Sequence, residues 1–372
     1  MRKKRVLHLS TAHSPRDPRI VYKQCPALAE RYEVWCALPR ADPSAAPEVR
    51  FIRLPRFRRV VWRVLLTSPY ILLRTFFLRP AIVHIYMPDL LPLAFIYRLL
   101  GSRVIYEVQE NIYKKVAIKR HNRSSLLQRF FRGFDEAARR CFYFIFTEHG
   151  YLQTYDRLRH PSVIVYNYPI VADYQPYRAT RHGPDSEINI FYLGGISFER
   201  AIDTVINGLA RLRQHGYPFR MHLFGPLAFP EKELETIPAY SQLRQHLVFY
   251  GYTDQQRALP IAAQSLAGLA LLKPVADYPE SYPTKLFEYM ALGLPVITSR
   301  FPLYREVVER HRCGFCIDPH DPQALADCLR FLIENPAEAE AMGERGRVAA
   351  ERYYTWETER RKLLDFYQLI EF

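Results

Sequence analysis

The chain has 372 residues, which points to two domains, since compact domains usually hold about 100 to 200 residues. Hydrophobic residues make up 49% and charged residues 24% of the chain, a composition that excludes a largely disordered protein. Lysine and arginine outnumber aspartate and glutamate by 52 to 38, so the net charge of +14 favours a phosphate, nucleic acid or an anionic membrane as partner.

Short runs rich in β-branched and aromatic residues alternate with helical patterns through the first half of the chain. We expect strands over residues 5–10, 33–38, 49–54, 82–86, 104–108, 143–147 and 163–166. These runs are apolar on both faces, as in a parallel sheet covered by helices on both sides. Residues 1–168 are therefore predicted to form a Rossmann-like, doubly wound α/β domain.

Two basic segments lie in this first domain. Between residues 49 and 88 there is no acidic residue, and eight arginines alternate with bulky apolar side chains: Arg50, Arg53, Arg56, Arg58, Arg59, Arg63, Arg74 and Arg79. The second segment has seven cations: Lys114, Lys115, Lys119, Arg120, Arg123, Arg129 and Arg132. Both suit an anionic membrane, although ordinary helices with solvated arginines share this pattern. Because Arg63, Pro69 and Arg74 interrupt the apolar residues 60–78, no transmembrane helix is expected.

A second series of strands follows a polar stretch at residues 169–187, which we interpret as a linker. Strands are expected over residues 188–193, 221–224, 247–250, 266–272 and 296–298. Residues 188–350 are thus predicted to be a second Rossmann-like domain, and residues 351–372 a helix that packs back on the first. Ligands of such sheets bind beyond the carboxyl ends of the strands, so we expect a cleft between two facing domains.

Residues 280–288, Glu-Ser-Tyr-Pro-Thr-Lys-Leu-Phe-Glu, are the most informative segment. Pro283 suits a first helical turn, and Gly293 and Pro295 suit the residues after a last turn. We therefore expect a helix over about 283–292.

Two carboxylates flank the start of this helix. Glu280 precedes it and Glu288 lies inside it, beside amide donors that favour a phosphate. Alternatively, Glu280 complements the helix dipole and Glu288 forms a surface salt bridge.

The six cysteines are scattered, and no cleavable signal precedes the first strand, so a reducing cytoplasm is expected. Cys313 and Cys316 have the spacing of half a zinc or redox site. Because no second pair lies nearby, structural cysteines are the favoured interpretation.

The order and spacing of five segments resemble the retaining nucleotide-sugar glycosyltransferases of family 4, almost from end to end. These segments are residues 13–20, 166–169, 192–200, 249–251 and 283–297. The resemblance implies two facing Rossmann-like domains, the GT-B architecture, and a donor site in the second domain.

By this resemblance, Glu280 is catalytic and positions the donor sugar, Glu288 binds the ribose, and Arg200 binds the diphosphate. The family commonly has a second cation where this chain has Gly195, and Lys285 is our candidate replacement, with a solvated lysine as the alternative. The remaining donor-binding candidates are Gly194, Gly225, Thr284 and Leu286.

In the first domain the resemblance makes His13 and Gln109 catalytic candidates. The family usually has histidine at the position of Gln109, and an amide cannot take a proton, so Gln109 either keeps the hydrogen bond without the charge or is a structural amide at a strand end. The acceptor-side candidates are Asp17, Arg19, Glu110 and Asn111; His13 and Asp17 alternatively are polar groups of a surface loop.

No two aspartates stand two residues apart, so the Asp-x-Asp metal motif is absent, and neither a metal nor a cofactor is expected. The expected function is transfer of a sugar from a nucleoside-diphosphate sugar to a glycan or lipid-linked acceptor at the cytoplasmic membrane face. A sugar-nucleotide epimerase and a nucleic-acid-binding protein are the alternatives, the latter disfavoured because no recognition helix or aromatic stacking motif is evident.

Overall fold

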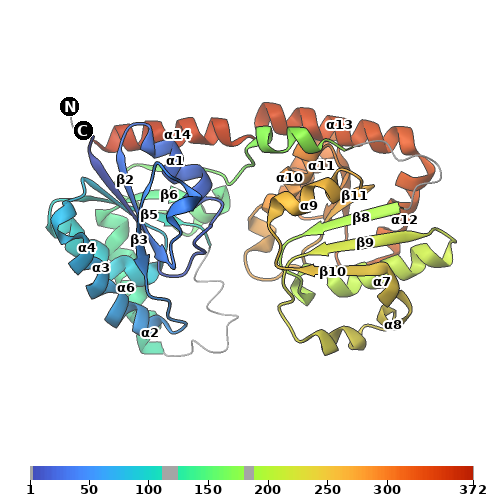
Figure 1. Cartoon of the computed structure of the whole chain (residues 1–372), viewed down its shortest axis with the longest axis horizontal. Helices are drawn as coiled ribbons and strands as arrows, with labels where there is room; N and C mark the ends of the chain where they lie inside the picture. Colours follow the sequence, from blue (N-terminus) through green and yellow to red (C-terminus); the bar gives the residue numbers. More distant parts are fainter. Residues whose placement is uncertain (1–2, 111–124, 180–187, 372) are drawn as a thin grey trace. The chain divides into compact units, whose positions relative to one another are not determined.

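The computed structural model describes residues 3–110, 125–179 and 188–371 (Figure 1). The chain divides into two compact units, one of Met1–Asn167 with Glu357–Phe372 and the other of Tyr168–Trp356. Residues 168–179, at the start of the expected linker, pack within the second unit: the Ala179 amide donates to the Leu292 carbonyl over 2.8 Å.

The first unit contains a parallel sheet of seven strands in the order β3-β2-β1-β4-β5-β6-β7. The bounds are β1 (Arg5–Leu9), β2 (Glu33–Pro39), β3 (Arg50–Leu54), β4 (Ile82–Ile85), β5 (Arg103–Val108), β6 (Tyr143–Phe146) and β7 (Ser162–Ile164). Each strand predicted from the sequence is present, within two residues at either end.

Successive side chains of these strands point to opposite faces of the sheet, and side chains on both faces are buried. Leu7 and Leu9 of β1 join an apolar core with α3 (Ser68–Thr75), α4 (Leu91–Leu99) and α6 (Ser125–Cys141). His8 points to the opposite face, where α1 (Cys25–Ala29) and α14 (Trp356–Ile370) lie. Figure 1 shows α3, α4 and α6 on one side of the sheet and α1 and α14 on the other.

Residues Val60–Leu78 form one helical segment of 19 residues, with a mean hydropathy of 1.3. It consists of α2 (Val60–Trp62), the π-helix η3 (Arg63–Thr67), α3 and the 3-10 helix η4 (Phe76–Leu78). Pro69 is accommodated because it lies in the first turn of α3, directly after the π-helix. In length and composition the segment is able to cross a membrane, so its packing decides whether it spans.

The second unit contains a parallel sheet of six strands in the order β10-β9-β8-β11-β12-β13. The strands are β8 (Ile188–Leu193), β9 (Phe219–Phe224), β10 (Leu247–Gly251), β11 (Ala267–Ala270), β12 (Val296–Ser299) and β13 (Gly314–Ile317). The helices are α7 (Ile202–Gln214), α8 (Tyr240–Leu243), α9 (Gln255–Ala262), α10 (Thr284–Leu292), α11 (Pro302–His311), α12 (Pro322–Glu334) and α13 (Pro336–Tyr353). As predicted, α10 ends at Leu292 and is followed by Gly293, which has φ +76°; it begins one residue after Pro283.

All six cysteines are free thiols. Burial raises the pKa of Cys313 and of Cys316 to about 12, so both remain protonated at neutral pH. This supports the interpretation that they are structural. Among the described residues, no group of three or more His, Cys, Asp or Glu side chains is arranged to hold a metal.

Candidate functional site

The backbone segments that follow β8 and β9 contain glycines and approach each other closely at the carboxyl ends of these strands. Gly194 has φ +133° and Gly225 has φ +142°, backbone conformations that favour glycine. The two backbones approach so closely that a Cβ on Gly225 would lie 2.0 Å from the Gly194 carbonyl oxygen. Gly194 and Gly195 are partly exposed and leave backbone open at the edge where such sheets bind ligands, whereas Gly225 is buried behind them.

Two cationic side chains lie beside Gly194, where the two backbone segments approach each other. Lys285, in the first turn of α10, is 6% exposed, and its Nζ lies 3.8 Å from the centre of the Tyr192 ring. Among the described residues that Nζ has no hydrogen-bond partner. A Cβ on Gly194 would lie 3.1 Å from Arg200 Nη1 and 3.3 Å from Lys285 Nζ, so both cations approach the same glycine.

The electrostatics of the two cations favour an anion. Burial, and then the neighbouring Arg200, lowers the pKa of Lys285 well below its ordinary value, while Glu288 opposes this shift. A bound anion would counter both causes. With the N-terminus of α10 beside them, the residues present fit a diphosphate.

The two glutamates lie where the sequence predicts. Glu280 ends the short 3-10 helix η12 (Tyr278–Glu280) before α10, and Glu288 lies within α10. Both side chains are partly exposed. Of the other donor-side candidates, Thr284 is exposed and Leu286 is fully buried, so only the backbone of Leu286 is open to a ligand role.

Tyr174 is a neighbour of Glu288 that the sequence analysis missed. Burial, and then the carboxylate of Glu288, raises the pKa of Tyr174 well above its ordinary value. Gln255 Nε2 donates to Tyr174 Oη over 2.6 Å and fixes the ring. Tyr174 lies in the expected linker, which also contains Ile170, Val171 and Tyr177, so the sequence does not single it out.

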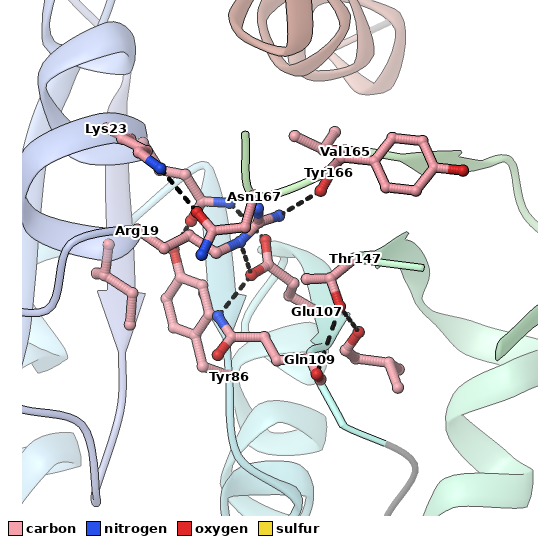
Figure 2. Close-up of polar contacts among 12 residues, drawn as sticks. Arg19, Lys23, Tyr86, Glu107, Gln109, Thr147, Val165, Tyr166 and Asn167 are labelled. Atoms are coloured by element: carbon pink, nitrogen blue, oxygen red, sulfur yellow. Dashed lines mark hydrogen bonds and ion pairs between the residues drawn. The ribbon is translucent and has the colours of Figure 1, made fainter. Parts of the chain in front are cut away.

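In the first unit, two of the candidates, Arg19 and Gln109, contact the buried carboxylate of Glu107 near the end of β5 (Figure 2). It accepts from Arg19 Nε over 2.8 Å, from Gln24 Nε2 over 2.5 Å and from Gln109 Nε2 over 2.7 Å. Burial opposes the charge of Glu107, but Arg19 and then His84 outweigh it and hold the pKa of Glu107 well below its ordinary value. Glu107 is thus a permanent anion that orients three side chains.

Two acceptor-side candidates have structural contacts. Asp17 Oδ1 accepts from the amides of Arg19 and Ile20 over 3.0 and 2.9 Å, and so caps the helical turn η1 (Ile20–Gln24). Arg19 is buried, with its Nη2 bonded to the Val165 carbonyl over 2.8 Å. Among the described residues, Arg19 Nη1 has no hydrogen-bond partner.

The orientation of Gln109 determines the tautomer of His13. Because Gln109 Nε2 donates to Glu107, its Oε1 faces His13 Nε2 over 2.9 Å and requires a proton there. His13 Nδ1 lies 2.6 Å from Ser10 Oγ, which donates to it. Both imidazole nitrogens are therefore engaged, which suits orientation of a ligand better than proton abstraction. Glu110 is exposed, and Asn111 lies outside the described residues.

A family comparison matches most of the second unit. Residues 175–349 match the family Glycosyl transferases group 1. A curated relative, D-inositol 3-phosphate glycosyltransferase of a Nocardioides species, is 27% identical over 194 residues. That alignment covers 50% of this chain and 42% of the relative, so the chain spans less than half the length of this relative.

Solved structures extend the likeness to the whole chain. A sucrose-phosphate synthase from Thermosynechococcus elongatus has a TM-score of 0.76 at 16% identity, over 99% of both chains. HepE of Anabaena, solved with UDP-glucose, has a TM-score of 0.74 at 14% identity, over 98% of this chain and 99% of that one. The expected fold class, two Rossmann-like parallel-sheet domains of GT-B type, is confirmed.

Proposed function

We propose that the protein is a retaining, metal-independent glycosyltransferase of the family-4 type. It transfers a sugar from a nucleoside-diphosphate sugar to a glycan or lipid-linked acceptor at the cytoplasmic membrane face. The observation that carries the proposal is the buried Lys285 ammonium, which has no hydrogen-bond partner among the described residues and lies beside Arg200 and Gly194 at the start of α10. The family match of residues 175–349 supports it.

The donor site follows from these contacts. Arg200 and Lys285 bind the diphosphate and stabilise the charge that develops as the bond from the anomeric carbon to phosphate breaks. These two cations and the helix N-terminus supply the positive charge that a metal ion supplies in other sites. Glu288 accepts hydrogen bonds from the ribose hydroxyls, and Glu280 from the donor sugar.

In a retaining transfer the new glycosidic bond forms on the face from which the diphosphate leaves. The acceptor hydroxyl gives its proton to the departing phosphate oxygen, so no side chain is needed as base. The engaged nitrogens of His13 support this division of roles, since His13 and Gln109 are held to orient a ligand.

The first experiment is a calorimetric titration with UDP-glucose, GDP-mannose and ADP-glucose. We expect one of them to bind in the presence of EDTA and, with a membrane extract as acceptor, to give a product that keeps the anomeric configuration of the donor by NMR. Conversion of the free nucleotide sugar without acceptor would indicate an epimerase instead. Oligonucleotide binding without any nucleotide-sugar binding would favour the nucleic-acid hypothesis.

Arg200 provides a second test of metal independence. Arg200→Ala should lower kcat/KM about 100-fold or more, whereas Arg200→Lys keeps the charge and should lose less. An activity that EDTA abolishes and magnesium restores would contradict the metal-free site.

A further inference from the structure

The segment Val60–Leu78 exposes large apolar side chains along one face. Leu65 is 58%, Leu73 76% and Phe77 86% exposed, and Val61, Trp62, Leu66 and Phe76 are also exposed. Soluble surfaces rarely carry so many neighbouring apolar side chains. We therefore expect this apolar face to bind a partner.

The opposite face of the same segment is fixed to the first unit. Thr67, Ile71 and Thr75, spaced by four residues, are fully buried. Ile71 belongs to the apolar core, and Thr75 Oγ1 is hydrogen-bonded to Tyr97 Oη of α4. To span a bilayer, the segment would have to lose these contacts.

Further contacts hold both ends of the segment. Arg63 Nε lies 3.6 Å from the buried Asp89 carboxylate, and Arg5 Nη1 donates to the Leu78 carbonyl over 2.8 Å. The segment is therefore a surface helix with one free face.

Neighbouring helices extend the apolar face. Ile96, Leu99 and Leu100 are exposed at the end of α4, with Leu99 at 86%. Phe130 of α6 is also exposed and reaches α4 through ring contacts with Phe134. Figure 1 shows α2, α3, α4 and α6 grouped on one side of the first unit.

Exposed arginines without an acidic partner among the described residues lie in the segment and directly before and after it. Five are exposed and, across the described parts of the chain, form no ion pair: Arg56, Arg58, Arg59, Arg74 and Arg79. No acidic residue occurs between positions 49 and 88. Exposed apolar side chains together with unpaired cations on one segment complement a bilayer whose headgroups are anionic.

We infer that the face formed by the 60–78 segment, the end of α4 and Phe130 binds an anionic phospholipid bilayer, with the 60–78 helix lying in the membrane plane. A second copy of the chain is a poorer occupant, because a two-fold contact would place arginines against arginines. The inference rests on the membrane location in the proposed function and gives it a surface, but it uses none of the donor-site residues, so vesicle binding and nucleotide-sugar binding are tested separately.

The test measures co-sedimentation of the full chain with phosphatidylcholine vesicles, with and without phosphatidylglycerol. Binding is expected only with the anionic lipid, and 1 M salt should weaken it, since the Debye length falls to about 3 Å. The quadruple variant Arg56→Ser, Arg58→Ser, Arg59→Ser and Arg74→Ser should bind at least about tenfold more weakly. The triple variant Leu65→Ser, Leu73→Ser and Phe77→Ser should lose the salt-resistant part.

The matched control is Tyr252→Ser, which removes an aromatic residue that is 81% exposed in the second unit. It should bind vesicles as the wild type does. UDP-glucose titration of every variant checks that the second unit is unaltered, and circular dichroism checks folding.

Depth-dependent quenching distinguishes a helix in the plane from one that spans. Trp62 and residue 73 are eleven residues apart, or about 16 Å along a helix. In the plane, lipid-bound quenchers should report the same shallow depth for Trp62 and for the tryptophan of a Leu73→Trp, Trp62→Phe variant. Depths that differ by about that distance would indicate a span and overturn the inference. So would absence of binding to anionic vesicles at low salt, or oligomers that the triple variant dissociates while vesicle binding persists.

Discussion

Lys285 is buried, and its Nζ has no hydrogen-bond partner within the described parts of the chain. Its Nζ contacts the face of Tyr192, and a cation–π contact recovers only part of the lost hydration. Such an arrangement costs stability unless a ligand supplies the missing negative charge. At the residue scale, therefore, the strongest indication of function is a buried lysine that lowers the stability of the protein when no ligand is bound.

The first prediction is that Lys285→Met stabilises the protein by about 1–3 kcal/mol while removing nucleoside-diphosphate binding. Methionine fills a similar volume without a charge to desolvate. Thermal unfolding and UDP titration measure the two effects. Lys232→Met, which alters an exposed lysine of the same unit, should change neither. Unchanged UDP affinity in Lys285→Met would remove this lysine from the donor site.

A pH dependence follows from the lowered pKa of Lys285. In the free protein the lysine loses its proton at a lower pH than usual, and a bound diphosphate raises its pKa again. As pH rises between these two values, binding must take up a proton, so affinity should fall by up to about tenfold per pH unit. Titrations of UDP in buffers of different ionisation enthalpy measure this uptake. In Lys285→Arg, whose guanidinium stays protonated, the uptake should vanish.

The carboxylates of the donor site have separable roles. Glu288→Gln should mainly raise KM for the donor, because ribose contacts persist from ground state to transition state, whereas Glu280→Gln should mainly lower kcat. Both should stay folded, since each side chain is partly exposed. Steady-state kinetics with the nucleotide sugar identified by titration separate the two constants, and near-normal turnover in either variant would contradict its assignment.

At the scale of the element, helix ends could be predicted from the residues at those ends, whereas burial that depends on a residue distant in the sequence could not. The start and end of α10 followed from Pro283 and Gly293, because prolines and glycines fix the backbone through their own geometry. The burial of Lys285 could not be predicted, since it depends on packing against Tyr192, which is distant in the sequence. The hydrogen bond of His84 could not be predicted for the same reason. His84 lies in an apolar strand, and its Nδ1 is 2.6 Å from Tyr367 Oη, which is 283 residues away in the sequence.

The link between η1 and β5 provides a prediction at this scale. Arg19→Met or Glu107→Gln alone leaves a buried charge without its partner and should cost about 3–5 kcal/mol. The double variant Arg19→Met, Glu107→Gln should cost less than the sum of the two single losses, and the double-mutant cycle of these variants by urea unfolding measures the coupling. Additive losses would mean that the ion pair does not couple the two elements.

The free energy of unfolding of the wild type should decrease at acid pH because of Glu107. Because the folded-state pKa of Glu107 is lowered, its stabilisation is present above the unfolded-state pKa of about 4.3 and is lost as pH falls below that value. Glu107→Gln should flatten this part of the stability profile.

At the scale of the whole molecule, the chain leaves the first unit after Asn167 and returns to it at Glu357. The returning α14 is an integral part of that unit: Tyr367 Oη bonds His84, and Glu359 Oε2 accepts from the Tyr166 amide over 2.8 Å. The C-terminal segment thus completes the polar face of a sheet that begins at residue 5. The two units should accordingly respond to different perturbations.

The final prediction uses hydrogen exchange to separate these responses. UDP at about 100 times its Kd adds roughly 2.7 kcal/mol to the state that binds it, so exchange should slow in peptides covering residues 192–200, 225–228 and 284–290. Tyr367→Phe removes the hydroxyl that is hydrogen-bonded to the buried His84 Nδ1, so it should speed exchange in β1, β4 and β5 while leaving the UDP-dependent protection of the second unit unchanged. Loss of that protection in Tyr367→Phe would show that the two units do not respond separately, whereas unaltered exchange in β4 would show that α14 contributes little to the first sheet.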